Sequence, residues 1–169
     1  PYLVVDFQHV KPARGAAFVR TSMKSMTNGK TLENTWSSGH KIDIVRVERR
    51  KFQFLYKDES GLNLMDNESF EQLAIPEDMV DSPQFLKEGM EVDILYHAEK
   101  DLPLRVELPQ YINVLVTYSE PGAKGDTATN VNKPATIETG AVVKVPLFIN
   151  EGDTIKIETL TGAYVERAK

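Results

Sequence analysis

The chain has 169 residues, of which 41% are hydrophobic and 27% charged, and its formal net charge at pH 7 is −5. This composition is typical of globular proteins, and no apolar run approaches the roughly 18 residues that a membrane-spanning helix needs. Cysteine is absent, which excludes disulfides, thiolate metal ligands and a thiol nucleophile. Because the chain opens directly on a strand pattern, we expect no signal peptide and a cytoplasmic protein.

The negative charge is unevenly distributed along the chain. Residues 1–46 have a net charge of +4, residues 47–109 of −8 and residues 110–169 of −1. A basic first segment can contact a polyanion locally, whereas an acidic middle segment is repelled by it. The asymmetry therefore favours local contact with nucleic acid, and random drift in surface charge is the alternative.

The first feature along the chain is a predicted β-hairpin with a cation near its tip. Strand-like runs over 2–10 and 16–23 flank Lys11-Pro12-Ala13-Arg14-Gly15, in which Pro and Gly indicate a turn. Six paired residues reach about 20 Å, so the hairpin can hold the Arg14 guanidinium well beyond the body of the protein. The alternative is a surface hairpin whose turn happens to contain an arginine.

Further strand signals recur at short spacings, with turn residues between them. This spacing favours all-β barrels over alternating strands and helices. Hairpin turns are predicted at Asn28-Gly29, Ser60-Gly61, Thr139-Gly140 and Thr161-Gly162. One short helix is predicted to start at Pro76 and to continue, after a break, over 83–87. The predicted strands are 30–36, 51–57, 61–66, 91–97, 102–108, 112–118, 141–148, 154–159 and 162–167.

Two joints divide the pattern into three units. The first joint is near Arg46-Val47-Glu48, where a basic segment becomes acidic, and the second is at Leu108-Pro109-Gln110, where Pro interrupts two strand patterns. We therefore predict three small β-barrel domains over 1–46, 47–109 and 110–169. Each is close to the lower size limit for an independent core, so we expect the domains to pack against one another or to be joined by short linkers.

Patterns for catalysis or metal binding are scarce. His9, His40 and His97 lie far apart without metal-site spacing, and no nucleotide-binding or nucleophile motif occurs. The carboxylates of the acidic middle segment are more typical of a solvated face than of an acid–base pair. We therefore predict that the protein is not an enzyme and that it has no cofactor and no metal site.

One polar loop, over residues 124–127, is a candidate binding element. Its glycines would let backbone N–H groups approach an anion or a base, and its lysine adds a positive charge. The alternative is a mobile connecting loop. The residues concerned are Lys124, Gly125, Asp126 and Thr127.

Long stretches of the chain resemble bacterial translation elongation factor P, of the elongation factor P and initiation factor 5A family. They cover nearly all of the chain and include PYLVVDFQHVKP, RGAAFVRT, VERRKFQFLY, FLKEGMEVDILY, EPGAKGDTA, KPATIETGAVVKVPLFINEGD and TGAYVERA. The resemblance implies an N-terminal KOW/SH3-like barrel, here without the family's first strand, followed by two OB-fold barrels. It also implies binding to the ribosome between the peptidyl and exit tRNA sites, where the factor relieves stalling at consecutive prolines.

The resemblance also implies roles for individual residues. Arg14 aligns with the family's tip residue, commonly a lysine that carries a covalent extension, so Arg14 is a predicted modification site for a modifying enzyme. The implied partners are the ribosome and a peptidyl-tRNA, either initiator or prolyl, and no membrane. The implied RNA contacts are Lys11, Pro12, Arg14, Gly15, Arg20 and Lys24, and the implied codon-side loop is Lys124, Gly125, Asp126 and Thr127.

Three alternatives to this function stay open. The first is a paralogue that resembles elongation factor P and also has an Ala-Arg-Gly tip, although Gly125-Asp126-Thr127 favours the factor proper. The second is a generic RNA-binding OB protein, which would stack bases on aromatic side chains. The single Trp argues against this. The third is a hydrolase that uses the acidic segment.

Overall fold

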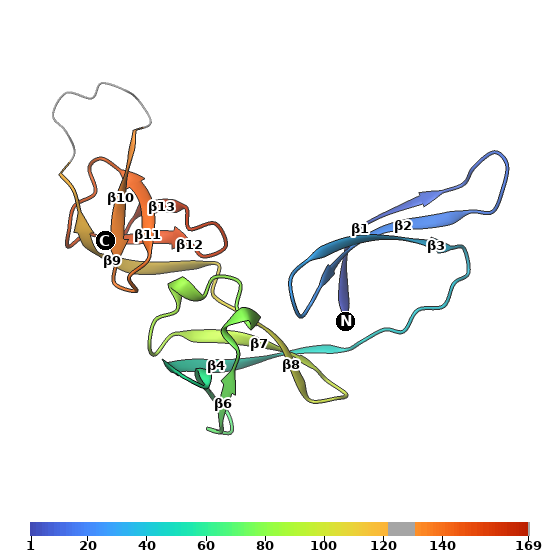
Figure 1. The fold of residues 1–169 in the computed structure, drawn as a ribbon, viewed down its shortest axis with the longest axis horizontal. Coiled ribbons are helices and arrows are strands. Elements are labelled where there is room, and N and C mark those ends of the chain that lie inside the picture. Colours follow the sequence, from blue (N-terminus) through green and yellow to red (C-terminus); the bar gives the residue numbers. More distant parts are fainter. Residues whose placement is uncertain (122–130, 169) are drawn as a thin grey trace.

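The computed structural model of the protein describes residues 1–121 and 131–168, and its regular structure is almost entirely β-strand. The strands form one three-stranded and two five-stranded sheets. Figure 1 shows these sheets as three units, with the central unit between the other two. The predicted all-β, three-domain fold is therefore confirmed. The described part of the chain has two helices of three residues each, and neither could cross a bilayer.

The N-terminal sheet is an antiparallel ribbon in the order β1-β2-β3. Val10 pairs with Phe18 on either side of the connecting loop, which confirms the predicted hairpin with Arg14 in its turn. The predicted turn at Asn28-Gly29 joins β2 to β3, and Gly29 has a φ of +69°. The strands are β1 (Tyr2–Val10), β2 (Phe18–Ser25) and β3 (Thr31–Ser37).

The central sheet is built around its first strand, in the order β6-β5-β4-β7-β8. Side chains alternate across the pleat, so Phe52 and Phe54 of β4 enter one core together with Leu64 and Ile94 from neighbouring strands. The strands are β4 (Val47–Asp58), β5 (Gly61–Asp66), β6 (Gln72–Ile75), β7 (Glu91–His97) and β8 (Leu102–Glu107).

The C-terminal sheet repeats this topology in the order β11-β10-β9-β12-β13, although the sequence has no exact internal repeat. Ile112, Val114 and Val116 of β9 point into its core at every second position. The edge strands β11 and β13 contact each other, which curls the sheet toward a barrel. The strands are β9 (Tyr111–Ser119), β10 (Asn132–Ile137), β11 (Val142–Pro146), β12 (Thr154–Glu158) and β13 (Tyr164–Arg167).

Three local predictions differ from the structure. Strand β10 is absent from the predicted strands, although the predicted turn at Thr139-Gly140 follows it closely. Strand β6 was not predicted, because its four residues are too few to show a clear alternation between an acidic turn and Pro76. The predicted short helix is instead two separate 3-10 turns, η1 (Glu77–Met79) and η2 (Pro83–Phe85). Val80 forms an isolated bridge to Val106 between them, and this extended residue interrupts the helical pattern.

The central and C-terminal sheets share hydrophobic contacts. Phe85 of η2 is 4% exposed and belongs to the core of the C-terminal sheet rather than to that of its own. Met90 and Leu108 pack against both cores. Lys87 adds an ion pair to Glu138 across the same joint, with an N–O distance of 2.9 Å. These contacts join the two units closely, as the small size of each predicted.

The Lys87–Glu138 pair predicts a pH dependence of stability. Burial raises the pKa of Glu138, but hydrogen bonds from Lys87 and from the Leu115 N–H outweigh it, so the pKa lies below its ordinary value. A carboxyl group whose pKa is lowered by folding stabilises the protein above its unfolded pKa, and this stabilisation is lost as the pH falls through the folded pKa.

Near neutral pH, we therefore expect the free energy of unfolding to be larger for the parent protein than for the Glu138→Gln variant. The difference should shrink below about pH 4, where a glutamate protonates. Denaturant titrations of both proteins at several pH values measure this difference. A difference that stays constant with pH would contradict the assignment.

Candidate nucleic-acid interface

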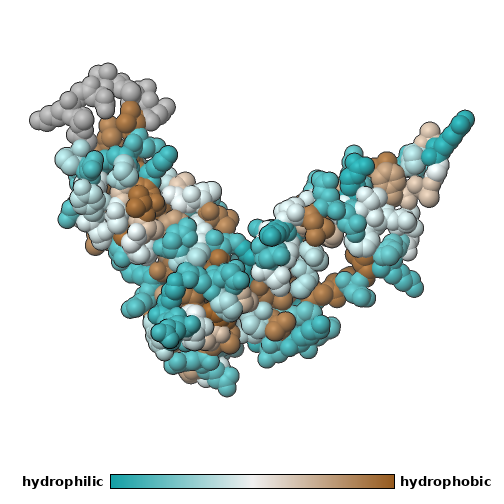
Figure 2. Space-filling view, viewed as in Figure 1, coloured by the Kyte–Doolittle hydropathy of each residue, from teal (hydrophilic) through white to brown (hydrophobic). Residues whose placement is uncertain are grey.

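The tip of the β1–β2 hairpin is a turn that presents Arg14 to solvent. Residues 11–17 connect the two strands, and the Arg14 side chain is exposed. Gly15 has a φ of +109°, a conformation that other residues rarely adopt, while a Cβ there would make only ordinary contact with Pro12. The turn therefore needs Gly15 for its backbone conformation. Figure 2 shows hydrophilic residues at the far end of this hairpin.

Strand β2 places Arg20 and the groove-lining side chains at alternate positions. Arg20 and Lys24 are four residues apart and so share one face of the strand. Val19, Thr21 and Met23 lie on the other face and line a groove of about 1440 Å³, which the long Lys24 side chain also reaches. The strand rise places Lys24 about 20 Å from the end of β2 at Phe18. Arg20 and Lys24 thus mark out a cationic track that leads from the body of the sheet toward Arg14.

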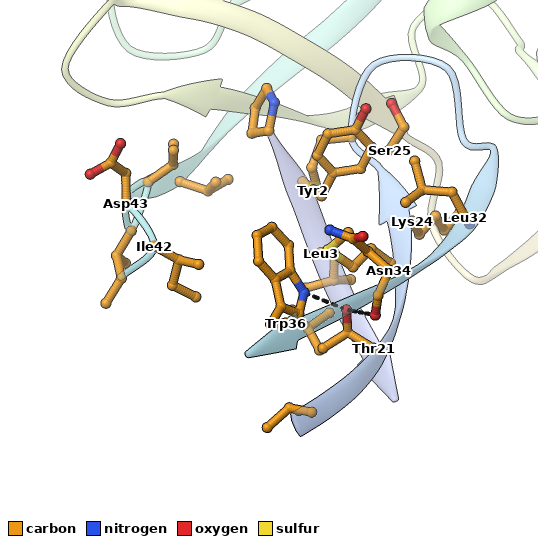
Figure 3. A pocket seen from close by; sticks show the side chains of 18 of the residues that line it. Tyr2, Leu3, Thr21, Lys24, Ser25, Leu32, Asn34, Trp36, Ile42 and Asp43 are labelled. Carbon is orange, nitrogen blue, oxygen red and sulfur yellow. Dashed lines mark hydrogen bonds between the residues drawn. The ribbon is translucent and has the colours of Figure 1, made fainter. Parts of the chain in front are cut away.

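The groove face of the N-terminal sheet is apolar and internally hydrogen-bonded. Trp36 Nε1 donates to Thr21 Oγ1 at 2.9 Å, and Thr21 Oγ1 donates in turn to the Asn34 carbonyl at 3.2 Å. Figure 3 shows Trp36 and Leu3 on the sheet, with Ile42 of the segment 38–46 across the groove. The groove also contains carboxylates, among them Asp43, Asp81 and Glu107, which repel a phosphate, so the opposite face with Arg20 is the candidate surface for nucleic acid.

The cations of the N-terminal domain differ in pairing from those of the central domain. Among the described residues, no cation before Arg46 forms an ion pair. In the central sheet, Arg49 lies 2.6 Å from Glu107 and Arg50 lies 2.7 Å from Asp101. Most of the described cations without an ion pair therefore belong to the N-terminal domain, and Lys100, Lys133 and Lys144 are the others. Those of the N-terminal domain are Lys11, Arg14, Arg20, Lys24, Lys30 and Lys41.

The structure brings only part of the predicted site together. Lys11, Pro12, Arg14 and Gly15 share the tip loop, whereas Arg20 and Lys24 lie further back along β2. The predicted loop residues Lys124, Gly125, Asp126 and Thr127 lie outside the described residues. Lys30 and Lys41 were not predicted as site residues. The sequence signal that included them was the net positive charge of residues 1–46.

Three family models match consecutive parts of the chain. They are the Elongation factor P (EF-P) KOW-like domain over residues 1–42, the Elongation factor P (EF-P) OB domain over 47–104, and Elongation factor P, C-terminal, over 112–167. Among solved structures, the chain is similar to eukaryotic translation initiation factor 5A from Methanococcus jannaschii. That match has 26% identity and a TM-score of 0.48, and it covers 63% of this chain and 79% of the other.

Curated relatives match along nearly the whole chain. The sequence is 54% identical to elongation factor P of Flavobacterium johnsoniae, over 99% of this chain and 89% of that protein. It is 55% identical to elongation factor P of Amoebophilus asiaticus, over 99% of this chain and 88% of that protein. A third relative, elongation factor P 1 of Porphyromonas gingivalis, is 52% identical over the same share of this chain. The chain therefore belongs to the elongation factor P family, whose members are translation elongation factors.

Proposed function

We propose that this protein binds the ribosome between the peptidyl and exit tRNA sites and stimulates peptide bond formation at consecutive prolines in the cytoplasm. The observation that carries the proposal is the hairpin of the N-terminal sheet, where exposed Arg14 and other cations without acidic partners in the described structure follow one another. Membership of a family of translation elongation factors supports the same role. The proposed mechanism uses no catalytic residue of this chain.

A positioning role fits the chemistry of the stalled reaction. Proline is a slow substrate because its nucleophile is a hindered secondary amine and its φ is restricted to about −65°. A factor that holds the CCA end of the peptidyl-tRNA in a reactive geometry lowers the entropic part of the barrier. Such a factor needs a rigid, extended element that contacts phosphates, rather than an acid–base pair. The β1–β2 hairpin is an element of this kind.

Individual residues take distinct parts in this proposal. Arg14 contacts the phosphate or ribose groups of the CCA end, because a planar guanidinium can donate two hydrogen bonds to one phosphate. Lys11, Arg20 and Lys24 bind backbone phosphates further along the tRNA, and Pro12 and Gly15 shape the turn. A modifying enzyme acts on Arg14 and extends its reach. The acidic central domain faces away from the tRNA backbone, because like charges repel it.

Ribosome profiling of a deletion strain and its parent tests the proposal. The expected result is a rise in ribosome occupancy at runs of prolines in the deletion strain and unchanged occupancy at other codons. Expression of the intact chain from a plasmid should restore the parental pattern. Equal occupancy at proline runs in both strains would rule the proposal out.

Asp126→Ala should weaken retention of the factor on the ribosome without unfolding the C-terminal domain. In the proposed complex Gly125 lets the backbone approach the exit-site codon, and Asp126 accepts a hydrogen bond from a base amino group. A contact to a base edge contributes about 1–3 kcal/mol, so the affinity should fall by about 5- to 150-fold. Binding of labelled factor to proline-stalled ribosomes measures it, with Glu151→Ala as a surface control. If Asp126→Ala binds with the parental affinity, the loop acts only as a connecting segment.

A further inference from the structure

Arg105 and Asp81 form an ion pair, here called the platform, at the joint between the central and N-terminal domains. The Arg105 side chain on β8 is 9% exposed and that of Asp81 is 31% exposed. The Arg105 Nε donates to Asp81 Oδ2 at 2.8 Å, and Nη2 forms an ion pair with Oδ1 of the same carboxylate. The bridge between Val80 and Val106 holds the Asp81 backbone beside β8. Two contacts to one carboxylate restrict the orientation of the guanidinium.

The β2–β3 turn of the N-terminal domain lies directly on this platform. A Cβ built on Gly29 would stand 3.2 Å from both Nη atoms of Arg105, which is tighter than most Cβ contacts, so a side chain here would push the guanidinium away by a few tenths of an ångström. The turn is itself tightly bonded. The Gly29 N–H donates to the Ser25 carbonyl at 3.0 Å, and the Ser25 N–H donates to the Lys30 carbonyl at 2.8 Å. The hydrogen-bonded β2–β3 turn therefore packs against a guanidinium whose orientation is restricted.

The rest of this joint is weakly connected. In the described part of the chain, no hydrogen bond or ion pair joins residues 1–45 to residues 47–168. The covalent connection, residues 38–46, has no strand or helix. At the other joint, by contrast, Phe85 is inserted into the neighbouring core. The close approach of Gly29 to Arg105 is thus a direct packing contact at a joint without hydrogen bonds or ion pairs in the described structure.

We propose that Arg105, held by Asp81, is a positioning residue that seats the β2–β3 turn and thereby sets where the hairpin tip stands relative to the central domain. The turn and the tip lie at opposite ends of β2, more than about 20 Å apart, so a tilt of about 10° at the turn moves the tip by roughly 4 Å. The part of this inference that concerns Arg14 rests on the proposed function. The part that concerns the orientation of the N-terminal sheet relative to the central domain, called the mechanical part below, does not.

Distances between spin labels test the mechanical part. The chain has no Cys, so Glu33→Cys on β3 and Glu59→Cys in the β4–β5 turn, both exposed, supply the two label sites without other changes. Gly29→Ala and Arg105→Lys should each broaden the distance distribution between these labels. Gly140→Ala is the matched control, because Gly140 also has a positive φ, of +86°, but its Cβ would meet nothing within 4 Å.

Two comparisons separate a change at the joint from misfolding of a single domain. Gly29 and Arg105 belong to different domains, so misfolding of one domain cannot explain broadening by both variants. A second label pair at Glu59 and Glu151 spans the central and C-terminal domains and should keep its distribution in every variant. Parental distributions between positions 33 and 59 in both Gly29→Ala and Arg105→Lys would overturn the proposal.

Stimulation of proline-run synthesis in a reconstituted translation system tests the functional part. If only about a tenth of the molecules hold the competent orientation, the concentration for half-maximal stimulation rises about tenfold while the saturating rate stays parental. Arg14→Ala should instead lower the saturating rate. An unchanged half-maximal concentration beside broadened distances would overturn the link to Arg14. If the parent gives no stimulation, the proposed function fails, and the label distances alone decide the joint.

Discussion

Arg14→Ala should remove the stimulation of proline-run synthesis while the protein melts at the parental temperature. Arg14 is exposed in a turn, and such surface substitutions usually change stability by no more than about 0.5 kcal/mol. A lost positioning contact, by contrast, can slow a reaction on the order of 10²-fold. Rates of synthesis of a proline-run reporter at saturating factor, together with melting curves, measure both effects.

Matched variants separate the position of Arg14 from its charge. Lys144→Ala removes an exposed cation from β11 of the C-terminal sheet, and the saturating rate should stay parental. Arg14→Lys keeps the charge but loses the planar fork of donors, so a substantial part of the stimulation should still disappear. If Arg14→Ala keeps both melting temperature and stimulation, Arg14 is an ordinary surface residue.

Trypsin reports whether Arg14 is modified in the native host. Trypsin cleaves poorly before proline, so Lys11-Pro12 stays intact and an unmodified Arg14 ends the peptide that contains these two residues. A modified Arg14 should resist cleavage and give a heavier peptide that ends at Arg20, because the enzyme must recognise a free guanidinium. A peptide ending at Arg14, in a fully active preparation, would show that the guanidinium alone suffices.

Phe85→Ala should reduce the free energy of unfolding by about 3–5 kcal/mol, the usual cost of truncating a buried Phe. Phe85 is 4% exposed and lies in the core of the C-terminal sheet, although it belongs to η2 of the central unit. The cavity would therefore open at the joint, where Met90 and Leu108 contact both cores. We expect one cooperative transition to separate into two, as measured by denaturant titration with probes in each domain.

Phe148→Ala is the control for this experiment. Phe148 belongs to the same C-terminal domain but is 60% exposed, so its truncation should change stability by no more than about 0.5 kcal/mol. A loss below about 1 kcal/mol in Phe85→Ala would mean that the joint closes over the gap. It would also show that the two units do not depend on Phe85 for their coupling.

Patterns of short range were enough to predict most of the strands and the hairpin tip. Alternation in residues such as Ile112, Val114 and Val116 has the period of a strand, and it emerges in the structure as β9 with these side chains inward. Pro12 and Gly15 indicated the turn that carries Arg14, because their backbone restrictions act within a few residues. The domain limits at 46/47 and 109/110 and the roles of the site residues stay predictions.

What the sequence by itself determined is thus the local structure, the three-unit pattern and the basic character of residues 1–46. Only the tertiary structure decided which cations are neutralised, since Arg49 meets Glu107 across 58 positions of sequence. It also decided that Phe85 serves its neighbour's core and that Gly29 rests on Arg105. The physical reason is range: turns and strand periods depend on neighbouring residues, whereas ion pairs and joints between domains depend on where whole sheets lie in space.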